Sequence, residues 1–266
     1  MTGPARYGLW RPLLALALYA LLLLLGIISL GWNLLAMALY PLLRSARGRE
    51  VGRAGIAYAY RFFWAVASAC RLMRIDASCL DALRDEPGLI VAANHPTMLD
   101  ALLLVAHLPR SACIMKASLM NNVFLGAGAR LARYICNDSA WTMVRLSVAD
   151  LRAGGQLVIF PEGTRTTVPP LNTFRPGLTL ISKLAKAPIQ TVFIDTDTRY
   201  LSKGWPMWRV PALPLVFTLR LGERFAPPQD SSAALVDLEA YFRHAMQHPP
   251  PQTFAECQLP RTHTLS

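Results

Sequence analysis

The side chains best suited to chemistry lie in residues 94–100, which read Asn-His-Pro-Thr-Met-Leu-Asp. An apolar run over 88–93 predicts a buried strand before them, and Pro96 fits the first position of a following helix. His95 then lies at the strand-to-helix turn, and its ring can fold back toward Asp100, about one turn inside the helix. A carboxylate on one ring nitrogen fixes the tautomer and leaves the other nitrogen free as a general base. No Ser or Cys nucleophile accompanies the pair, so the attacking hydroxyl would come from a substrate.

A second stretch, 158–166, runs from an apolar strand into a turn that holds Glu162, Gly163, Thr164 and Arg165. Glycine permits close backbone approach, arginine presents a planar fork that suits phosphate, and loop N–H groups can add donors. The stretch therefore predicts an anion-binding loop. The simpler alternative is a strand-to-loop turn with solvated charges, just as a lone histidine is often structural.

Together the two stretches resemble the lysophospholipid acyltransferase family, the glycerolipid acyltransferases typified by 1-acylglycerol-3-phosphate acyltransferase. The first family block, Asn-His-x-x-x-x-Asp, is matched by Asn94, His95 and Asp100. The third block, Phe-Pro-Glu-Gly-Thr-Arg, is matched without change by residues 160–165. The order and separation of the blocks also fit, and the resemblance covers roughly residues 71–221.

The resemblance implies acyl transfer from a thioester to a lipid hydroxyl. His95 would take the hydroxyl proton and later return it to the departing thiolate, while Asp100 orients and charge-stabilises the ring. The phosphate of the acceptor would rest on the 162–165 loop, with Arg165 as its ion pair. Glu162 would position a glycerol hydroxyl or hold Arg165. No metal or organic cofactor is implied, because the sequence has no metal-ligand cluster and no glycine-rich nucleotide loop.

Two weaker candidates complete the expected site. Lys116 matches a basic residue that relatives carry between the first and second blocks. The second block departs from the family, because residues 134–138 read Tyr-Ile-Cys-Asn-Asp where relatives carry an arginine. This departure puts lysophosphatidic acid in doubt as the acceptor. Asn137 would bind a hydroxyl or amide instead, or it is a turn residue.

The expected partners are an acyl thioester of acyl carrier protein or coenzyme A, a lysophospholipid-like acceptor and the membrane. One alternative keeps the chemistry on a specialised acceptor, such as an amino-acid lysolipid or a hydroxy lipid. Another is a non-catalytic membrane protein that binds lipid through the same groove. The intact residues His95 and Asp100 and the unchanged third block argue against the non-catalytic alternative.

Composition supports a membrane-associated protein with an anionic partner. Hydrophobic residues make up 53% and charged residues 16% of the 266 residues, whereas an average soluble domain is about 25% charged. The formal net charge is +11. Basic clusters with interleaved aromatic residues are absent from the sequence, so we expect no nucleic acid but lipid headgroups, a phosphorylated substrate or an acidic carrier. The five scattered cysteines form no Cys-x-x-Cys pair, which indicates small buried side chains in a reducing compartment.

The uncharged run 12–43 predicts a hydrophobic helical membrane anchor. A helix of this length would be about 48 Å long, against a hydrocarbon core of about 30 Å, so it tilts strongly or bends. Gly26, Gly31 and Asn33 could make a break that returns the chain to the same leaflet. More arginines follow the run than precede it, which places the downstream domain on the cytoplasmic face of the inner membrane. The following arginines are Arg44, Arg47, Arg49 and Arg53.

We expect four segments along the chain. Residues 1–53 form the anchor with its basic flanks, and 54–74 form a helix that lies at the membrane interface or packs on the core. Residues 75–247 form an α/β domain, and 248–266 form a proline-rich tail, loosely ordered.

The fold class of the 75–247 segment is α/β, an acyltransferase-type sheet flanked by helices, because strand and helix patterns alternate. Strands are expected at 89–93, 112–115, 134–136, 156–160, 189–194 and 215–221. Helices are expected at 96–108, 121–133, 140–153, 178–186 and 231–247, the last with Ser232 as its cap.

Overall fold

The computed structural model of the chain describes residues 11–43, 46–206, 209–248 and 262–263. Expectations for Arg44 and for most of the proline-rich tail lie outside the described residues. The strands are β1 (Met73–Asp76), β2 (Ile90–Ala93), β3 (Ser111–Met115), β4 (Ile135–Cys136), β5 (Gln156–Ile159), β6 (Ile189–Thr196), β7 (Leu215–Phe225) and β8 (Thr262–His263). The helices are α1 (Arg11–Leu39), α2 (Ala46–Ala69), α3 (Asp100–His107), α4 (Gly126–Leu131), α5 (Ala140–Arg152), α6 (Gly177–Ala185) and α7 (Ser231–Gln247), with 3-10 turns η2 (Ser78–Leu83) and η3 (Ala117–Asn121).

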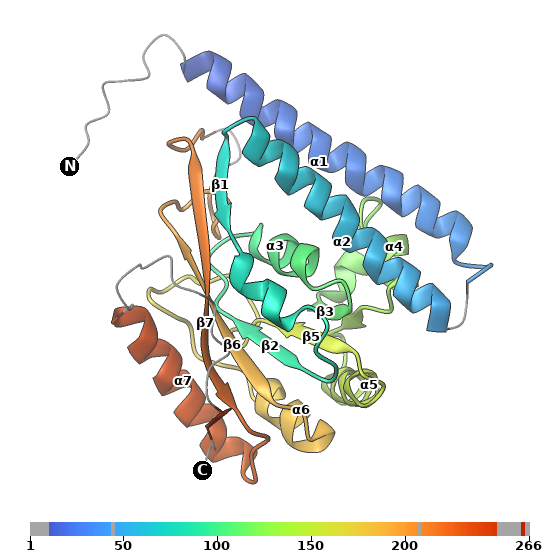
Figure 1. The fold of residues 1–266 in the computed structure, drawn as a ribbon, viewed down its shortest axis with the longest axis vertical. Helices are drawn as coiled ribbons and strands as arrows, with labels where there is room; N and C mark the ends of the chain where they lie inside the picture. The colour runs from blue at the N-terminus through green and yellow to red at the C-terminus, as the bar shows by residue number, and fades with distance from the viewer. Residues whose placement is uncertain (1–10, 44–45, 207–208, 249–261, 264–266) are drawn as a thin grey trace.

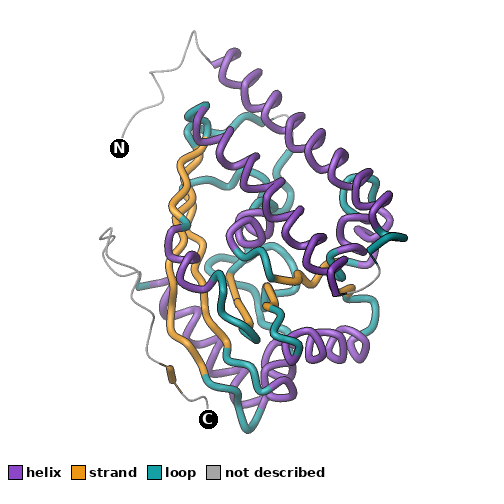
Figure 2. Tube along the Cα trace, turned by 45° about the vertical axis from the view of Figure 1, so that its right-hand side comes forward, coloured by secondary structure: helices purple, strands orange, loops and turns teal. Residues whose placement is uncertain are grey.

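The strands form one mixed sheet in the order β1-β7-β6-β2-β5-β3-β4, and β8 pairs with β7 (Figures 1 and 2). Strands β6, β2, β5, β3 and β4 are parallel, whereas β7 is antiparallel to β6. The carboxyl ends of the five parallel strands therefore meet at one edge of the sheet. Every strand that the apolar runs predict is present, which confirms the α/β expectation.

Alternating side chains on each strand enter two separate cores. On β2, Val91 and Ala93 face the core beneath α1, α2 and α3, whereas Ile90 and Ala92 face the core beneath α5, α6 and α7. This alternation follows from the two-residue repeat of a strand that is covered on both faces. The result is a helix–sheet–helix sandwich whose α1–α2 side is visible at the upper right of Figure 1.

Helix α1 is continuous from Arg11 to Leu39, so the expected break at Gly26, Gly31 or Asn33 is wrong. Asn33 does not interrupt the helix, because its side chain is satisfied by another element. Its Nδ2 donates to the carbonyl of Val123 at 2.7 Å, and its Oδ1 accepts from the N–H of Gly128 at 2.9 Å. The asparagine thus connects α1 to the α4 region.

Helix α2 begins at Ala46 and so crosses the boundary expected at residue 54. It packs on the core through Phe63 and Trp64, which are 0% and 4% exposed, while Tyr58 and Phe62 point outward at 64% and 57%. The helix also lies directly on α4, since a side chain in place of Gly52 would collide with the backbone of Ala132. Helix α2 therefore packs on the core through one face and presents Tyr58 and Phe62 on the other.

A buried ion pair fixes α2 to the domain. The Arg53 side chain is 4% exposed, and its Nη2 donates to Asp150 Oδ1 at 2.9 Å. Its Nε and Nη1 donate to the carbonyls of Ala132 and Arg110. Arg49 reaches the same carboxylate oxygen at 3.2 Å. Two arginines expected to flank the anchor as free charges are instead part of the domain's packing.

Two helix boundaries and one helix cap differ from expectation for local reasons. The segment expected as a helix over 121–133 is η3, a loop and the short α4, because the N–H of Phe124 donates to Asn122 Oδ1 at 2.8 Å in a side-chain turn. Helix α7 is capped by Asp230, not Ser232, since Asp230 Oδ1 accepts the N–H of Ser232 at 2.7 Å. Helix α3 begins four residues later than expected, because the Asp100 carboxylate binds Thr97 in a turn before the helix.

Candidate active site

The structure places all the expected site segments at the carboxyl edge of the parallel strands. His95 follows β2, the 162–165 loop follows β5, Lys116 follows β3 and Asn137 follows β4. Neighbouring strands lie about 4.8 Å apart, so along the edge Lys116 starts roughly 10 Å and Asn137 roughly 14 Å from the β2 position. The His95 and 162–165 segments are therefore adjacent, whereas Lys116 and Asn137 are exposed and more distant.

His95 and Asp100 form the close pair that their spacing predicts. His95 Nδ1 lies 2.9 Å from Asp100 Oδ2, and the two side chains are 16% and 0% exposed. Asp100 is the first residue of α3 and not one turn inside it, so Pro96 is not helical. The Asp100 carboxylate closes a turn before the helix starts, because it accepts the Thr97 N–H at 2.7 Å and the Thr97 hydroxyl at 2.6 Å.

These bonds determine the state of the His95 ring. A buried carboxylate that already accepts two donors from Thr97 requires a third donor at Nδ1, so Nδ1 carries the proton of the neutral ring. Nε2 is then an acceptor, and within the described residues no side chain bonds to it. The Phe160 ring stacks on the imidazole with centroids 3.9 Å apart and an interplanar angle of 18°. The free nitrogen is thus held in a fixed plane.

Asn94 anchors the turn that carries His95. Its side chain is bound on both sides to the backbone of Ile194 on β6: Nδ2 donates to the carbonyl at 3.0 Å, and Oδ1 accepts the N–H at 2.7 Å. The residue is 2% exposed. Asn94 therefore holds the end of β2 against β6, which explains its presence in the first block.

Glu162 has a role that differs from either expectation. Its Oε1 accepts the N–H of His95 at 3.2 Å and the hydroxyl of Thr166 at 2.7 Å, and its Oε2 accepts the N–H of Asn172 at 2.9 Å. It does not contact Arg165, and both carboxylate oxygens already accept bonds from the protein. At 2% exposure, Glu162 ties the 162–165 loop to the backbone of the general-base candidate.

Arg165 is held by the loop that follows β6. Its Nη1 donates to the carbonyls of Leu201 at 2.8 Å and Ser202 at 3.3 Å, and the Leu201 carbonyl also accepts the N–H of Met98 at 3.1 Å. The Nε and Nη2 groups of Arg165 make no hydrogen bond within the described residues. The backbone N–H groups of Thr164 and Arg165 are likewise unbonded there. Four donors of this loop are therefore available to an anion.

Arg175 is a candidate that the sequence reasoning missed. Gly163 adopts a φ of +68°, and a Cβ on it would lie 3.2 Å from Arg175 Cγ and 3.7 Å from Arg175 Nε. The N–H of Arg175 donates to the carbonyl of Pro161 at 2.7 Å, which fixes its backbone beside the loop. Its exposed guanidinium makes no ion pair within the described residues. No sequence signal links positions so far apart, since the contact depends on how the loop folds back.

The neighbouring cysteines are poor nucleophiles. Burial raises the pKa of the Cys113 thiol on β3 to about 12. Burial, and then the charge of Asp138, raises the pKa of Cys136 at the end of β4. A reactive cysteine instead has a lowered pKa. The attacking group at this edge is therefore not a protein thiolate.

Comparison with known proteins finds a family model that matches this part of the chain. Residues 74–195 match the family model described as Acyltransferase, and both site stretches lie inside this range. This stretch is an acyltransferase domain. The family resemblance carried by the two sequence blocks is thereby confirmed.

The acyltransferase fold is shared with a solved structure. The chain is similar to the 1-acyl-sn-glycerophosphate (LPA) acyltransferase, PlsC, from Thermotoga maritima, with 18% sequence identity and a TM-score of 0.60. The match covers 84% of this chain and 95% of that chain. Among curated proteins no match to the sequence was found. The likeness confirms an acyltransferase-type sheet flanked by helices with an apolar helix at its N-terminus.

Proposed function

We propose that the acyltransferase domain moves a fatty acyl group from an acyl carrier protein or coenzyme A thioester to a hydroxyl of a lysophospholipid-like acceptor. The observation that carries this proposal is the 2.9 Å contact between His95 Nδ1 and Asp100 Oδ2, with Nε2 left unbonded by any described side chain. A base of this kind without a protein nucleophile suits direct attack by a substrate hydroxyl.

The reaction follows from the ring's geometry. Nε2 of His95 accepts the proton of the acceptor hydroxyl while the hydroxyl oxygen bonds to the thioester carbonyl carbon. The carbonyl electron pair moves to oxygen, which gives a tetrahedral oxyanion. When this intermediate collapses, the C–S bond breaks and the proton passes from Nε2 to the thiolate sulfur. Asp100 stabilises the imidazolium that exists between the two transfers.

The acceptor would carry a phosphate that rests on the 162–165 loop. Thr164 and Arg165 have unbonded donors in this loop, and Arg175 adds a second cation beside Gly163. Arginine binds phosphate through paired N–H groups, and charge-assisted bonds are the strong ones. Arg175 thus compensates for the arginine missing from residues 134–138, and it supports a lysophosphatidic-acid-like acceptor more than a specialised neutral lipid.

Replacing Arg175 with glutamine tests this acceptor assignment. Loss of one charge-assisted contact should raise the KM for lysophosphatidic acid roughly 10–150-fold and leave the KM for the thioester unchanged. The control is Arg145→Gln, which removes the same charge from an exposed position on α5. An unchanged KM, or an equal rise with a neutral hydroxy lipid as acceptor, would exclude Arg175 from phosphate binding.

We further propose that the chain lies on one face of the membrane. Residues 12–39 form a helix that is long and apolar enough to cross a membrane, judged by length and composition. Its buried positions run from Leu18 to Ala36 on one side, so about 27 Å of the helix is held against the domain. A spanning orientation would draw the packed polar domain into the hydrocarbon. An in-plane orientation leaves the outer apolar face in lipid.

The cytoplasmic face of the inner membrane remains our proposed location, with the 75–247 segment as the α/β acyltransferase unit. Arg49 and Arg53 contribute little to the charge bias, because both pair with Asp150. The location rests instead on the thioester donors, which are made in the cytoplasm.

A further inference from the structure

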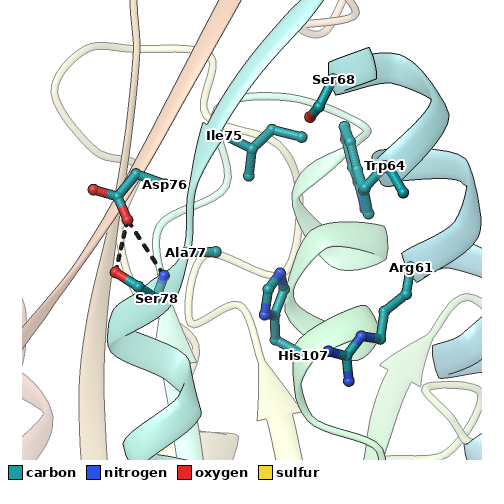
Figure 3. Close-up of a pocket in the computed structure, with 9 residues that line it drawn as sticks. Arg61, Trp64, Ser68, Ile75, Asp76, Ala77, Ser78 and His107 are labelled. Carbon is teal, nitrogen blue, oxygen red and sulfur yellow. Dashed lines mark hydrogen bonds between the residues drawn. The ribbon is translucent and has the colours of Figure 1, made fainter.

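A second cavity lies away from the His95 site. It has a volume of about 360 Å³ and lies between α2, β1, the start of η2 and the end of α3 (Figure 3). Helix α3 connects the two places, with Asp100 at one end and His107, which lines the cavity, at the other, about 10 Å away. The lining residues are Arg61, Trp64, Ala65, Ser68, Ile75, Asp76, Ala77, Ser78 and His107.

Polar groups without partners line this cavity. Trp64 is 4% exposed, yet its indole Nε1 has no hydrogen-bond partner, and buried His107 Nδ1 has none either. Arg61 is half-buried and makes no hydrogen bond within the described residues. Figure 3 shows these three side chains grouped on one side of the cavity, from α2 and α3. Indole and guanidinium are donors only, so the expected ligand is an acceptor.

The carboxylates near the cavity accept no hydrogen bond from these donors. Asp76 lines the wall, but it accepts the N–H and hydroxyl of Ser78 at 3.3 and 2.8 Å and lies on the opposite side in Figure 3. Asp81 is 65% exposed and its oxygen is 3.9 Å from His107 Nδ1, beyond hydrogen-bond distance. Burial lowers the pKa of His107, the Asp81 charge opposes this effect, and the charges of Arg61 and Arg84 add to it. The net effect favours the neutral His107 ring, which lies beside the charge of Arg61.

The cavity lies beside the outer face of α2, and α1 also presents apolar side chains outward. Tyr58 and Phe62 face outward on α2, and Ala65 continues the same stripe into the cavity wall. On α1, Leu16, Leu23 and Ile27 are 66%, 65% and 59% exposed. Aromatic and arginine side chains at such a boundary lie at the level of lipid headgroups when the apolar face contacts a bilayer.

We propose that this cavity binds the phosphate of an anionic membrane lipid through Arg61, Trp64 and His107. The position beside the apolar surface favours a lipid phosphate over free phosphate, since the acyl chains would extend along α2. The lipid would hold the domain at a fixed depth and orientation on the membrane. This site goes beyond the proposed acyl transfer and depends only on the membrane contact of α1 and α2.

The test is binding of radiolabelled phosphatidylglycerol to the full chain in a neutral detergent. Arg61→Gln should weaken binding roughly 10–150-fold, because it removes a charge-assisted contact. Trp64→Phe keeps the aromatic volume and removes the N–H, so it should weaken binding about 2–12-fold. Arg145→Gln removes the same charge from α5 and should leave binding unchanged.

Two further arms separate this site from its alternatives. His95→Ala should bind phosphatidylglycerol as the wild type does, and inorganic phosphate should not compete at comparable concentration. If His95→Ala lost binding while Arg61→Gln kept it, the lipid would be assigned to the acyltransferase site and the proposal would be overturned. Equal losses in Arg61→Gln and Arg145→Gln, or effective competition by inorganic phosphate, would also overturn it.

Discussion

Replacing His95 with alanine is expected to lower the turnover number about 10²–10⁴-fold, the contribution of a positioned general base. No other described side chain is placed to take the acceptor proton, because the neighbouring carboxylates of Asp100 and Glu162 are buried and each already accepts three bonds from the protein. The change should leave the loop in place, since the backbone of residue 95 would still bond to Glu162 and Thr166. The measurement is steady-state thiol release at saturating donor and acceptor.

The matched control is His244→Ala, which removes an exposed histidine from α7 on the far side of the sheet. It should keep wild-type turnover. Circular dichroism and thermal unfolding of both variants would show whether the fold is retained. If a folded His95→Ala protein retained more than about a tenth of the rate, the role of His95 as base would be wrong.

Replacing Arg53 with alanine is expected to lower the free energy of unfolding by about 3–5 kcal/mol, because the largely buried Asp150 carboxylate would lose its buried partner and keep only the more exposed Arg49. Asp150 Oδ2 already has no hydrogen-bond partner, so the carboxylate depends on its arginines. The change also removes the Arg53 donors from the carbonyls of Arg110 and Ala132. The melting temperature should fall by roughly 6–20 °C in a protein of this size.

Arg49→Ala is the control within the same network. Arg49 reaches the same oxygen of Asp150, but its side chain is 23% exposed against 4% for Arg53. A partly solvated pair contributes about 1 kcal/mol or less, so the melting temperature should fall by no more than roughly 2–4 °C. Equal losses in the two variants would show that burial of Arg53 is not what stabilises the α2 contact.

The parts of the fold that depend on local pattern were predictable. Strand β2 is a continuous apolar run, and β5 and most of β6 are also buried and largely apolar, so hydrophobicity is the main signal that identifies them. Helix α7 has the predicted ends. Strand β1 was missed because Met73–Asp76 alternates too briefly to give a signal, and its pairing with β7 joins distant segments. Asn33 was taken for a break because its partners, on and near α4, lie far along the chain.

The contacts of the site also fall into those that local sequence predicts and those that depend on the fold. The pairing of His95 with Asp100 spans five residues and follows from a single turn, so the spacing predicts it. The contacts of Glu162 were not foreseen, because two of its three donors are backbone N–H groups, which residue types do not reveal. Arg175 and the cavity near Trp64 depend on tertiary approach between segments. Sequence patterns therefore locate the reactive pair, whereas the surrounding contacts require the fold.

Acceptor-dependent thiol release tests the central claim most directly. The purified full chain would be mixed with a labelled acyl coenzyme A thioester, with and without lysophosphatidic acid, and both free thiol and labelled ester would be measured. Direct transfer predicts thiol release only with the acceptor, and one labelled ester for each thiol. A stoichiometric burst of thiol without acceptor would show an acyl-enzyme and contradict the role of His95 as base for a substrate hydroxyl. The absence of any acceptor-dependent release with either coenzyme A or acyl carrier protein thioesters would contradict the acyltransferase assignment itself.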